Sequence, residues 1–293
     1  MPAEGGIPGV DALVRRALAE DRVRNDRTTE LLFPRPLAAE AVVSAQASGV
    51  LSGMAAVRAL ARAAGLQVRS ARADGSRIRP GTVVARLGGD ARRILGIERT
   101  LLNFLMHASG IATATDRAVR ATDGGRPRLA VYATRKTLPG LRDLEKAAVV
   151  HGGGRPHRRD LSDAILVKNN HLVFVPLETA IERARAGARP GERVQVEVRT
   201  GAEALRAARA GIRDLLIDNA SPARARAIVR ALERAGQRRS CFLELSGGIT
   251  PETIARYRSV GADAASLGAL THSAVAMPFH LTLRPARLSH RAD

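Results

Sequence analysis

Six short apolar segments in the second half of the chain end in charged or small polar residues. The segments are RLAVYAT, AILVKN, VQVEVRT, DLLIDNA, CFLELSGG and AASLGA. The groups at or just beyond their ends are Arg135 and Lys136, Lys168, Glu197, Asp218, Ser246 to Gly248, and Gly268. One polar residue after an apolar segment is ordinary, because strands must leave the core, but six in succession indicate a shared site.

The cations among these residues suit an anionic ligand. Only three of the 47 lysines and arginines are lysines, and two of them, Lys136 and Lys168, follow apolar segments. Lysine is a compact point charge that fits against phosphate or carboxylate oxygens, and arginine binds the same groups through charge-assisted hydrogen bonds. The pair Arg135 and Lys136 in YATRKTLPG therefore predicts an anion site. Lys168 could instead form a Schiff base with a carbonyl substrate.

The acidic and small residues predict the complementary parts of such a site. Glu197 and Asp218 are carboxylates on separate segments, and they suit either sugar hydroxyls or a hydrated Mg²⁺. The SGG turn, Ser246 to Gly248, and the turn SLGALTHS, with Gly268 and His272, open toward expected helices. Backbone N–H groups in such turns can cradle a phosphate.

A glycine-rich stretch, HGGGRPHRRD, lies between the first two apolar segments at residues 151–160. Such a stretch is often only a flexible connector. Here it carries His157 and Arg158, which add donors between two charged segment ends. We therefore expect this loop to cover a ligand.

Composition limits the class of protein. The chain has 293 residues and 45% hydrophobic content, which is enough for about two domains. No run of about 18 apolar residues occurs, so no membrane span is expected. The N-terminus has no basic-then-apolar signal pattern, so we expect a cytoplasmic protein. Cys241 is the single cysteine, which excludes an intrachain disulfide and a cysteine metal cluster.

The charge is strongly positive, at +19. Such an excess is compatible with nucleic acid or with an anionic small substrate as the partner. Aromatic residues make up only 2% of the chain, so platforms for stacking bases are scarce. The arginines are also spread through alanine-rich stretches such as IERARAGARP, which is typical of a solvated surface. We therefore expect a small anion rather than nucleic acid as the ligand.

From about residue 128 the pattern alternates between strand and helix. One helix is expected in each of the five intervals between the apolar segments, at residues 139–150, 176–187, 201–211, 221–235 and 250–259. Nearly continuous apolar strands separated by helices predict a parallel sheet covered by helices. Six such steps favour a barrel of six or seven strands, short of the eight in a complete barrel. In such folds the carboxyl ends of the strands face the active site.

The first part of the chain has a different pattern. Apolar residues on one face predict a helix at residues 8–20, and a long helix is expected at about 91–120. Between them, residues 40–88 predict short strands broken by glycine, with a turn-rich hairpin connection at DGSRIRPG. The C-terminal segment has a short alternating stretch that predicts an edge strand, followed by residues expected to fray.

Several long motifs resemble those of the quinolinate phosphoribosyltransferase family, the decarboxylating nicotinate-nucleotide pyrophosphorylases. The central stretch is TRKTLPGLRDLEKAAVVHGGGRPHRRDLSDAILVKNNHL, with ERTLLNFL before it and SGGIT and SLGALTHSA after it. The motifs occur in the family's order. The resemblance extends from EDRVRNDRTTELL to HLTL, which is nearly the whole chain.

This resemblance implies a fold and a reaction. It implies an N-terminal α+β sandwich over residues 1–115, joined by the tail 276–293, and an incomplete α/β barrel over residues 116–275. The implied reaction transfers phosphoribose from phosphoribosyl pyrophosphate to quinolinate, with Mg²⁺. It gives nicotinate mononucleotide, pyrophosphate and CO₂ in NAD biosynthesis. The family also implies a homodimer with shared active sites, in which one N-terminal domain lies over the partner's barrel.

The resemblance implies roles for the cationic residues. Arg135, His157 and Arg158 match the clamp on the quinolinate carboxylates, and Arg99 of ERTLLN would join them from the partner subunit. Lys136 and Lys168 would lie near the substrate acid and the pyrophosphate.

The remaining roles concern the sugar phosphate. Glu197 and Asp218 would face the ribose hydroxyls and hold Mg²⁺, and with Lys136 and Lys168 they would form the catalytic set. The residues expected around the 5′-phosphate are Ser246, Gly247, Gly248, Gly268 and His272.

Three departures from the family pattern leave the substrate acid open. Asn25-Asp26 replaces a Gly-Asp pair, Arg159-Asp160 replaces a smaller and more apolar pair, and Arg199 stands where an acid is frequent. Arg159 and Arg199 add positive charge near the expected site. A paralogue of the same fold that acts on a different pyridine or aromatic carboxylate is therefore the alternative. The molybdenum-operon paralogues fit less well, because they lack the Lys-x-Asn-His stretch that LVKNNHL keeps.

Overall fold

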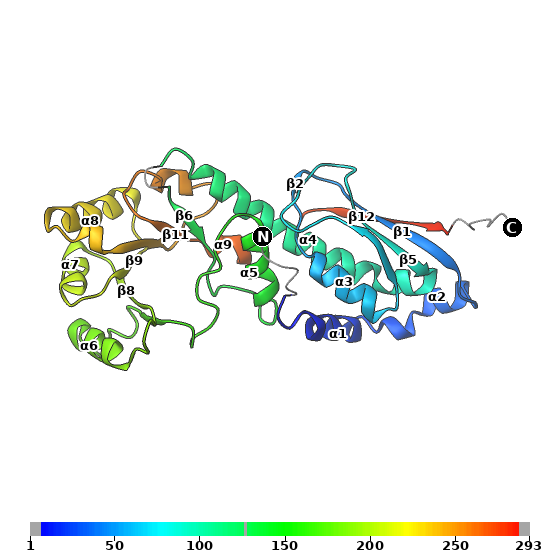
Figure 1. Cartoon of the computed structure of the whole chain (residues 1–293), viewed down its shortest axis with the longest axis horizontal. Helices are drawn as coiled ribbons and strands as arrows, with labels where there is room; N and C mark the ends of the chain where they lie inside the picture. The colour runs from blue at the N-terminus through cyan, green and yellow to red at the C-terminus, as the bar shows by residue number, and fades with distance from the viewer. Residues whose placement is uncertain (1–6, 126–127, 287–293) are drawn as a thin grey trace. The chain divides into compact units, whose positions relative to one another are not determined.

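The structure, a computed structural model, describes residues 7–125 and 128–286. The chain divides into two compact units (Figure 1). The first comprises Met1–Ala114, Pro139–Gly152 and Ala274–Asp293, and the second comprises Thr115–Leu138 and Gly153–Ser273. No helix within the described residues is both long enough and apolar enough to cross a membrane.

The first unit is built on an antiparallel sheet of four strands in the order β12-β1-β5-β3. The strands are β1 (Ala38–Ala45), β3 (Gln67–Ala71), β5 (Val83–Asp90) and β12 (Phe279–Pro285). Alternate residues of β1 are buried, as expected for a strand with one face on a core. β12 pairs with β1, so the alternating C-terminal stretch forms the edge strand that its pattern predicts. Residues 287–293, expected to fray, lie outside the described residues.

Helices supply the other layer of this unit. They are α1 (Val10–Glu20), α2 (Arg27–Leu32), α3 (Met54–Ala63), α5 (Arg142–His151) and the first part of α4 (Ala91–Ala121), with a 3₁₀ turn η1 (Val23–Asn25). Two short strands, β2 (Gly49–Val50) and β4 (Arg77–Ile78), pair as a ribbon at the predicted hairpin connection. Leu51, Leu60 and Leu87 are completely buried in the core of this unit. The helices expected at 8–20 and 91–120 are confirmed as α1 and α4.

The second unit is built on six parallel strands in the order β6-β11-β10-β9-β8-β7. They are β6 (Ala130–Tyr132), β7 (Ile165–Val167), β8 (Val194–Val198), β9 (Asp214–Asp218), β10 (Phe242–Ser246) and β11 (Ala264–Ser266). All six expected strands are present. β6 and β7 form the two edges of the sheet, so the barrel is incomplete. A single parallel bridge from Tyr132 to Arg155 extends the β6 edge.

The connecting helices of this unit are α6 (Leu177–Gly187), α7 (Gly201–Arg209), α8 (Pro222–Arg234) and the short α9 (Ala269–His272). α6, α7 and α8 pack in sequence order beside one another, and α6 and α7 contact β8 (Figure 1). Thr200 and Ser221 cap α7 and α8 by accepting backbone N–H bonds from Glu203 and Arg224. Pro222 occupies the first turn of α8, as predicted.

Two helix predictions are wrong in detail. The helix expected from residue 139 begins at Arg142, because Gly140 has a φ of 82° and interrupts the helical backbone. The segment 250–259 contains turns and a 3₁₀ helix, η3 (Ile254–Tyr257), in place of an α-helix. The N–H of Thr253 donates to the Thr250 carbonyl and that of Arg256 to the Thr253 carbonyl. Such i to i+3 bonds tighten the chain into 3₁₀ turns.

Candidate active site

The parallel register brings the predicted site residues to one edge of the barrel sheet. Arg135 and Lys136 follow β6, and Lys168 follows β7 directly. Glu197 is the penultimate residue of β8, and Asp218 and Ser246 end β9 and β10. Asp218 and Ser246 are register partners. Because all six strands run in one direction, their carboxyl ends share one edge, and the predicted residues come from these ends.

Arg135 and Arg158 form the cationic centre of this edge. Burial, and next the charge of Arg135, lower the pKa of the Arg158 guanidinium, while Glu197 and Asp163 act in the opposite direction. The two guanidinium groups therefore lie close enough to repel each other. The Nε donor of Arg135 is buried and has no acceptor among the described residues. A buried donor without an acceptor costs about 1–3 kcal/mol, so an anionic ligand here would relieve both costs.

Glu197 and Asp218 are linked through Asn169, the residue after Lys168. The Asn169 backbone N–H donates to Oε2 of Glu197 at 2.8 Å, and its side-chain Nδ2 donates to Oδ2 of Asp218 at 3.3 Å. Oδ1 of Asn169 is buried and has no partner among the described residues. Two carboxylates thus meet the N–H groups of one asparagine where β7, β8 and β9 end. This link is a finding of the structure.

Lys136 packs beside the last strand of the sheet. A Cβ atom added to Gly268 would lie 2.7 Å from Cδ of Lys136 and 3.0 Å from Nε2 of His272. The Thr271 hydroxyl donates to the Lys136 carbonyl at 2.7 Å. The residues that follow the neighbouring strands β6 and β11, Lys136 on one side and Gly268 and His272 on the other, therefore lie together. Because Gly268 has no side chain, the aliphatic part of Lys136 fits beside it.

The SGG turn has a left-handed backbone at both glycines. Gly247 and Gly248 have φ angles of 90° and 64°, a region that glycine adopts without steric cost. A Cβ atom on Gly247 would lie 2.6 Å from Oδ1 of Asn219, whereas one on Gly248 would meet no atom within 4 Å. The N–H of Asn219 donates to the Ser246 carbonyl at 2.9 Å. Gly247 is therefore required by packing, and Gly248 only by its backbone angle.

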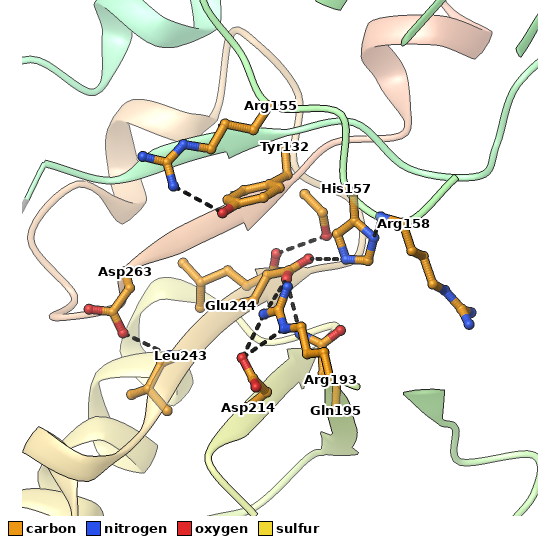
Figure 2. Close-up of polar contacts among 12 residues, drawn as sticks. Tyr132, Arg155, His157, Arg158, Arg193, Gln195, Asp214, Leu243, Glu244 and Asp263 are labelled. Carbon is orange, nitrogen blue, oxygen red and sulfur yellow. Dashed lines mark hydrogen bonds and ion pairs between the residues drawn. The ribbon is translucent and has the colours of Figure 1, made fainter. Parts of the chain in front are cut away.

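The ring of His157 is directed at a buried carboxylate of the sheet. Its Nε2 atom is 3.1 Å from Oε1 of Glu244, a carboxylate with no solvent exposure. Figure 2 shows His157 directed at Glu244 while the Arg158 side chain points away from that carboxylate. The structure thus places His157 near the site but turns its ring toward the sheet.

Two predicted residues stand apart from these contacts. Lys168 is exposed, and its backbone N–H donates to Nδ1 of His171 at 2.9 Å, which closes the turn after β7. Arg99 is exposed on α4 in the first unit and lines a hollow of that unit with Thr100, Asn103 and Pro139. Neither position tests the roles that the resemblance implies.

Sequence reasoning missed Glu244 and Gln195, which lie in β10 and β8. Both are buried polar residues inside apolar strands, LEL and VQV. A buried polar residue is normally hydrogen bonded, so each interruption of an apolar strand was a usable signal. Together, the sheet edge and its side chains define an α/β-barrel protein built to bind small anions.

Comparison with known proteins identifies the family. Residues 26–109 match the family described as quinolinate phosphoribosyl transferase, N-terminal domain, and residues 111–282 match its C-terminal domain. A probable nicotinate-nucleotide pyrophosphorylase [carboxylating] of Archaeoglobus fulgidus is 40% identical over 243 residues, 83% of this chain and 93% of that protein. The human nicotinate-nucleotide pyrophosphorylase [carboxylating] is 36% identical over 83% of this chain and 82% of that protein.

Solved structures agree. NadC from Streptococcus pyogenes is 37% identical, with a TM-score of 0.85 over 94% of this chain and 98% of that chain. The nicotinate-nucleotide pyrophosphorylase of Francisella tularensis is 29% identical, with a TM-score of 0.87 over 96% of this chain and 98% of that chain. The chain belongs to the quinolinate phosphoribosyl transferase family, as its motifs predict. The predicted fold, an incomplete α/β barrel with an N-terminal α+β domain, is confirmed.

The two glycines of the SGG turn make a matched pair of variants. We expect Gly247→Ala to weaken binding of ribose 5-phosphate about tenfold or more, because its methyl group would push Asn219 away and distort the turn. Gly248→Ala should lower the stability of the turn by only about 1–2 kcal/mol, the strain of an alanine in the left-handed conformation. It should therefore weaken binding less than Gly247→Ala. Isothermal titration calorimetry of both folded variants measures the difference. Equal effects would show that packing against Asn219 does not shape this turn.

Proposed function

We propose that the chain catalyses decarboxylating phosphoribosyl transfer from phosphoribosyl pyrophosphate to quinolinate, a step of NAD biosynthesis. The observation that carries the proposal is the pair Arg135 and Arg158, two repelling guanidiniums with a buried donor left over, beside the carboxylates Glu197 and Asp218. A dicarboxylate supplies an acceptor for Nε of Arg135 and negative charge for both arginines, and the carboxylates suit a sugar that becomes cationic. The curated relatives named above carry this activity in their names.

The residues divide the chemistry between them. Arg135 and Arg158 hold the quinolinate carboxylates, and Lys136 and Lys168 hold the acid and the pyrophosphate. The ring nitrogen attacks C1 of the ribose while the bond from C1 to the pyrophosphate oxygen breaks, and the pair of electrons leaves with pyrophosphate. Positive charge develops on the ribose during this step, and the nearby carboxylates of Glu197 and Asp218 stabilise it.

Loss of CO₂ follows on the same cationic surface. The carboxylate next to the ring nitrogen leaves as CO₂, and its electron pair remains on the ring carbon, which then takes up a proton. The nitrogen is positively charged once it carries the ribose, and this charge stabilises the electron pair. The 5′-phosphate is held meanwhile by the SGG turn, with Gly268 and His272 on its other side.

The donor set at the ends of β7, β8 and β9 fits Mg²⁺. Magnesium binds oxygen ligands and is commonly held by one or two carboxylates together with substrate phosphates. Glu197, Asp218 and the orphaned Oδ1 of Asn169 supply three such oxygens. Bound there, the ion would neutralise charge on the pyrophosphate. Within residues 7–125 and 128–286 no cluster of three or more His, Cys, Asp or Glu forms a self-sufficient metal site, so we infer that substrate completes the coordination.

The active unit is a homodimer in this proposal, and the protein is cytoplasmic. Arg99 would reach the quinolinate carboxylates of the partner subunit, as the family resemblance implies. Its exposed position on α4 leaves the guanidinium available for such a contact.

A paralogue that acts on another aromatic acid is the second candidate. It was suggested by the extra cations Arg159 and Arg199. Nη2 of Arg199 lies 3.6 Å from Oε1 of Glu203, and its backbone N–H donates to the same carboxylate. Its positive charge is therefore largely offset and adds little to the site, which weakens the reason for a different acid.

The central test is turnover. We expect pyrophosphate release only when quinolinate and phosphoribosyl pyrophosphate are both present, with one CO₂ per pyrophosphate from carboxyl-labelled quinolinate. Arg135→Lys should raise the KM for quinolinate about tenfold or more, because lysine loses the planar fork. Arg199→Gln, a nearby arginine paired with Glu203, is the control and should change little. A folded dimer that ignores quinolinate but turns over another pyridine carboxylate would establish the paralogue.

Asn169 and its neighbour test the metal site. We expect Asn169→Ala to weaken Mn²⁺ binding about tenfold or more in the presence of phosphoribosyl pyrophosphate, because the two carboxylates lose the amide that links them. Electron paramagnetic resonance of free Mn²⁺ measures this without turnover. Asn170→Ala removes the adjacent, exposed amide and should leave the affinity unchanged. Equal affinities in all three proteins would rule out this site.

Shared active sites predict complementation. Arg99→Ala and Lys136→Ala should each abolish most turnover alone. Co-refolded in equal amounts, half of the dimers combine the two variants, and one of the two sites in each is intact, so about a quarter of wild-type activity should return. No recovery in a mixture shown to exchange subunits would place Arg99 in the site of its own chain or outside any site.

A further inference from the structure

A buried carboxylate in the middle of the barrel sheet has no part in the chemistry described so far. Glu244 lies in β10 and is completely buried. Burial alone would raise its pKa, but the contacts with His157, followed by those with Gln195 and Ser266, outweigh burial and leave the pKa below its usual value. A buried charge persists only when its partners satisfy it, so these contacts keep Glu244 ionised.

Three side chains contact Glu244 from two directions (Figure 2). Nε2 of Gln195, on β8, donates to Oε2 at 2.9 Å. Nη2 of Arg193 lies 3.8 Å from the same oxygen and 2.7 Å from Oδ1 of Asp214. The other oxygen, Oε1, is buried, meets no hydrogen-bond donor with good geometry among the described residues, and lies 3.1 Å from Nε2 of His157. One side of the carboxylate is therefore fixed by the sheet, and the other is left for His157.

Both ring nitrogens of His157 are committed within the protein. The backbone N–H of Arg158 donates to Nδ1 at 2.7 Å, so Nδ1 carries a lone pair. Nε2 must then carry the proton for its contact with Glu244 to be attractive. The geometry thus defines a neutral imidazole protonated on Nε2.

His157 also has an unusual backbone. Its φ is 52°, in the left-handed region that a non-glycine residue adopts only when its surroundings enforce it. The ring contacts Tyr132 edge to face at a centroid distance of 5.9 Å, and the Tyr132 hydroxyl accepts from Arg155 at 3.1 Å. Contacts on both sides of His157 therefore enforce the turn from which Arg158 leaves.

We propose that Glu244 is a positioning residue that locks His157 as the Nε2-protonated tautomer and thereby fixes the segment that carries Arg158. This inference deepens the proposed function and rests on it for the identity of the ligand. His157 then supports Arg158 from within the protein, in addition to the clamp role that the resemblance implies. Arg135 and Arg158 bind the dicarboxylate, and Glu244 sets the geometry of Arg158 through His157.

Histidine nitrogen shifts test the tautomer without turnover. In ¹⁵N-histidine-labelled protein, long-range ¹H–¹⁵N spectra should show one histidine with Nε2 protonated and Nδ1 unprotonated, assigned to His157 by its loss in His157→Gln. Glu244→Gln should move this signal toward a mixture of tautomers. Asp263→Asn is the matched control. Asp263 accepts from Leu243 on the same strand at 2.7 Å and pairs with Arg238, and its replacement should leave the signal in place.

Kinetics test the consequence for Arg158. Glu244→Gln should raise the KM for quinolinate about tenfold, while the KM for phosphoribosyl pyrophosphate changes by less than about twofold. Glutamine has one acceptor oxygen where the carboxylate has two, so the variant can accept from Gln195 or from His157 but not from both, and one contact is lost. The double variant Glu244→Gln/Gln195→Glu restores a donor–acceptor pair and a carbonyl facing His157, and it should recover most of the affinity for quinolinate.

The outcomes separate the two proposals. Absence of quinolinate turnover in the wild-type protein would remove the proposed function, while the nitrogen spectra would still decide the tautomer. An unchanged His157 signal in folded Glu244→Gln, or equal rises in both KM values, would overturn the positioning role. If Glu244→Gln does not fold, Gln195→Met keeps the carboxylate but removes its anchor. It should shift the His157 signal and raise the KM for quinolinate, and failure to do either would overturn the role.

Discussion

The parallel register of six strands is the constraint on which the site depends. Each strand end delivers one or two residues, and none of these could bind a small anion by itself. Because neighbouring strands run in the same direction, their ends form a continuous row in which Asp218 and Ser246 are register partners. The helices between the strands serve this register, since capping by Thr200 and Ser221 begins α7 and α8 directly after β8 and β9. The site therefore forms only because the strands are parallel, since their common direction brings the terminal side chains together.

Two neighbouring arginines concentrate positive charge at this edge. Several arginines elsewhere have local acidic partners, as in the pairs Arg206–Glu178 and Arg189–Glu192. At the site, Arg135 and Arg158 face each other, and one buried donor stays without an acceptor. Preorganised, uncompensated charge is what an anionic substrate and a charged transition state require. The high net charge of the chain thus says less about function than this single repulsive pair.

Much of this fold could be predicted from sequence, and the failures have physical causes. The six apolar segments were recognised because buried parallel strands are apolar throughout. The helices α2 and α9 are too short to show a helical periodicity of apolar residues. The helix α3 lies in an alanine-rich part of residues 40–88, where the glycine-broken pattern predicts strands and turns instead. At the site, residues with charge at strand ends were found, whereas Asn169 and Glu244 were not assigned their roles. Their partners lie far along the chain, Glu197 and Asp218 for Asn169 and His157 for Glu244. A polar residue in an apolar strand marks Glu244, but no local pattern identifies its partner.

The pairing of β12 with β1 has a consequence for how the molecule is made. The first unit is assembled from three separate stretches of the chain, and its edge strand β12 is the last strand in the sequence. A ribosome must therefore finish the whole barrel before the N-terminal sheet can acquire its outer strand. Until then β1 exposes an unpaired edge, which is the kind of surface that recruits foreign strands. The nascent chain therefore has an open sheet edge until β12 has been synthesised.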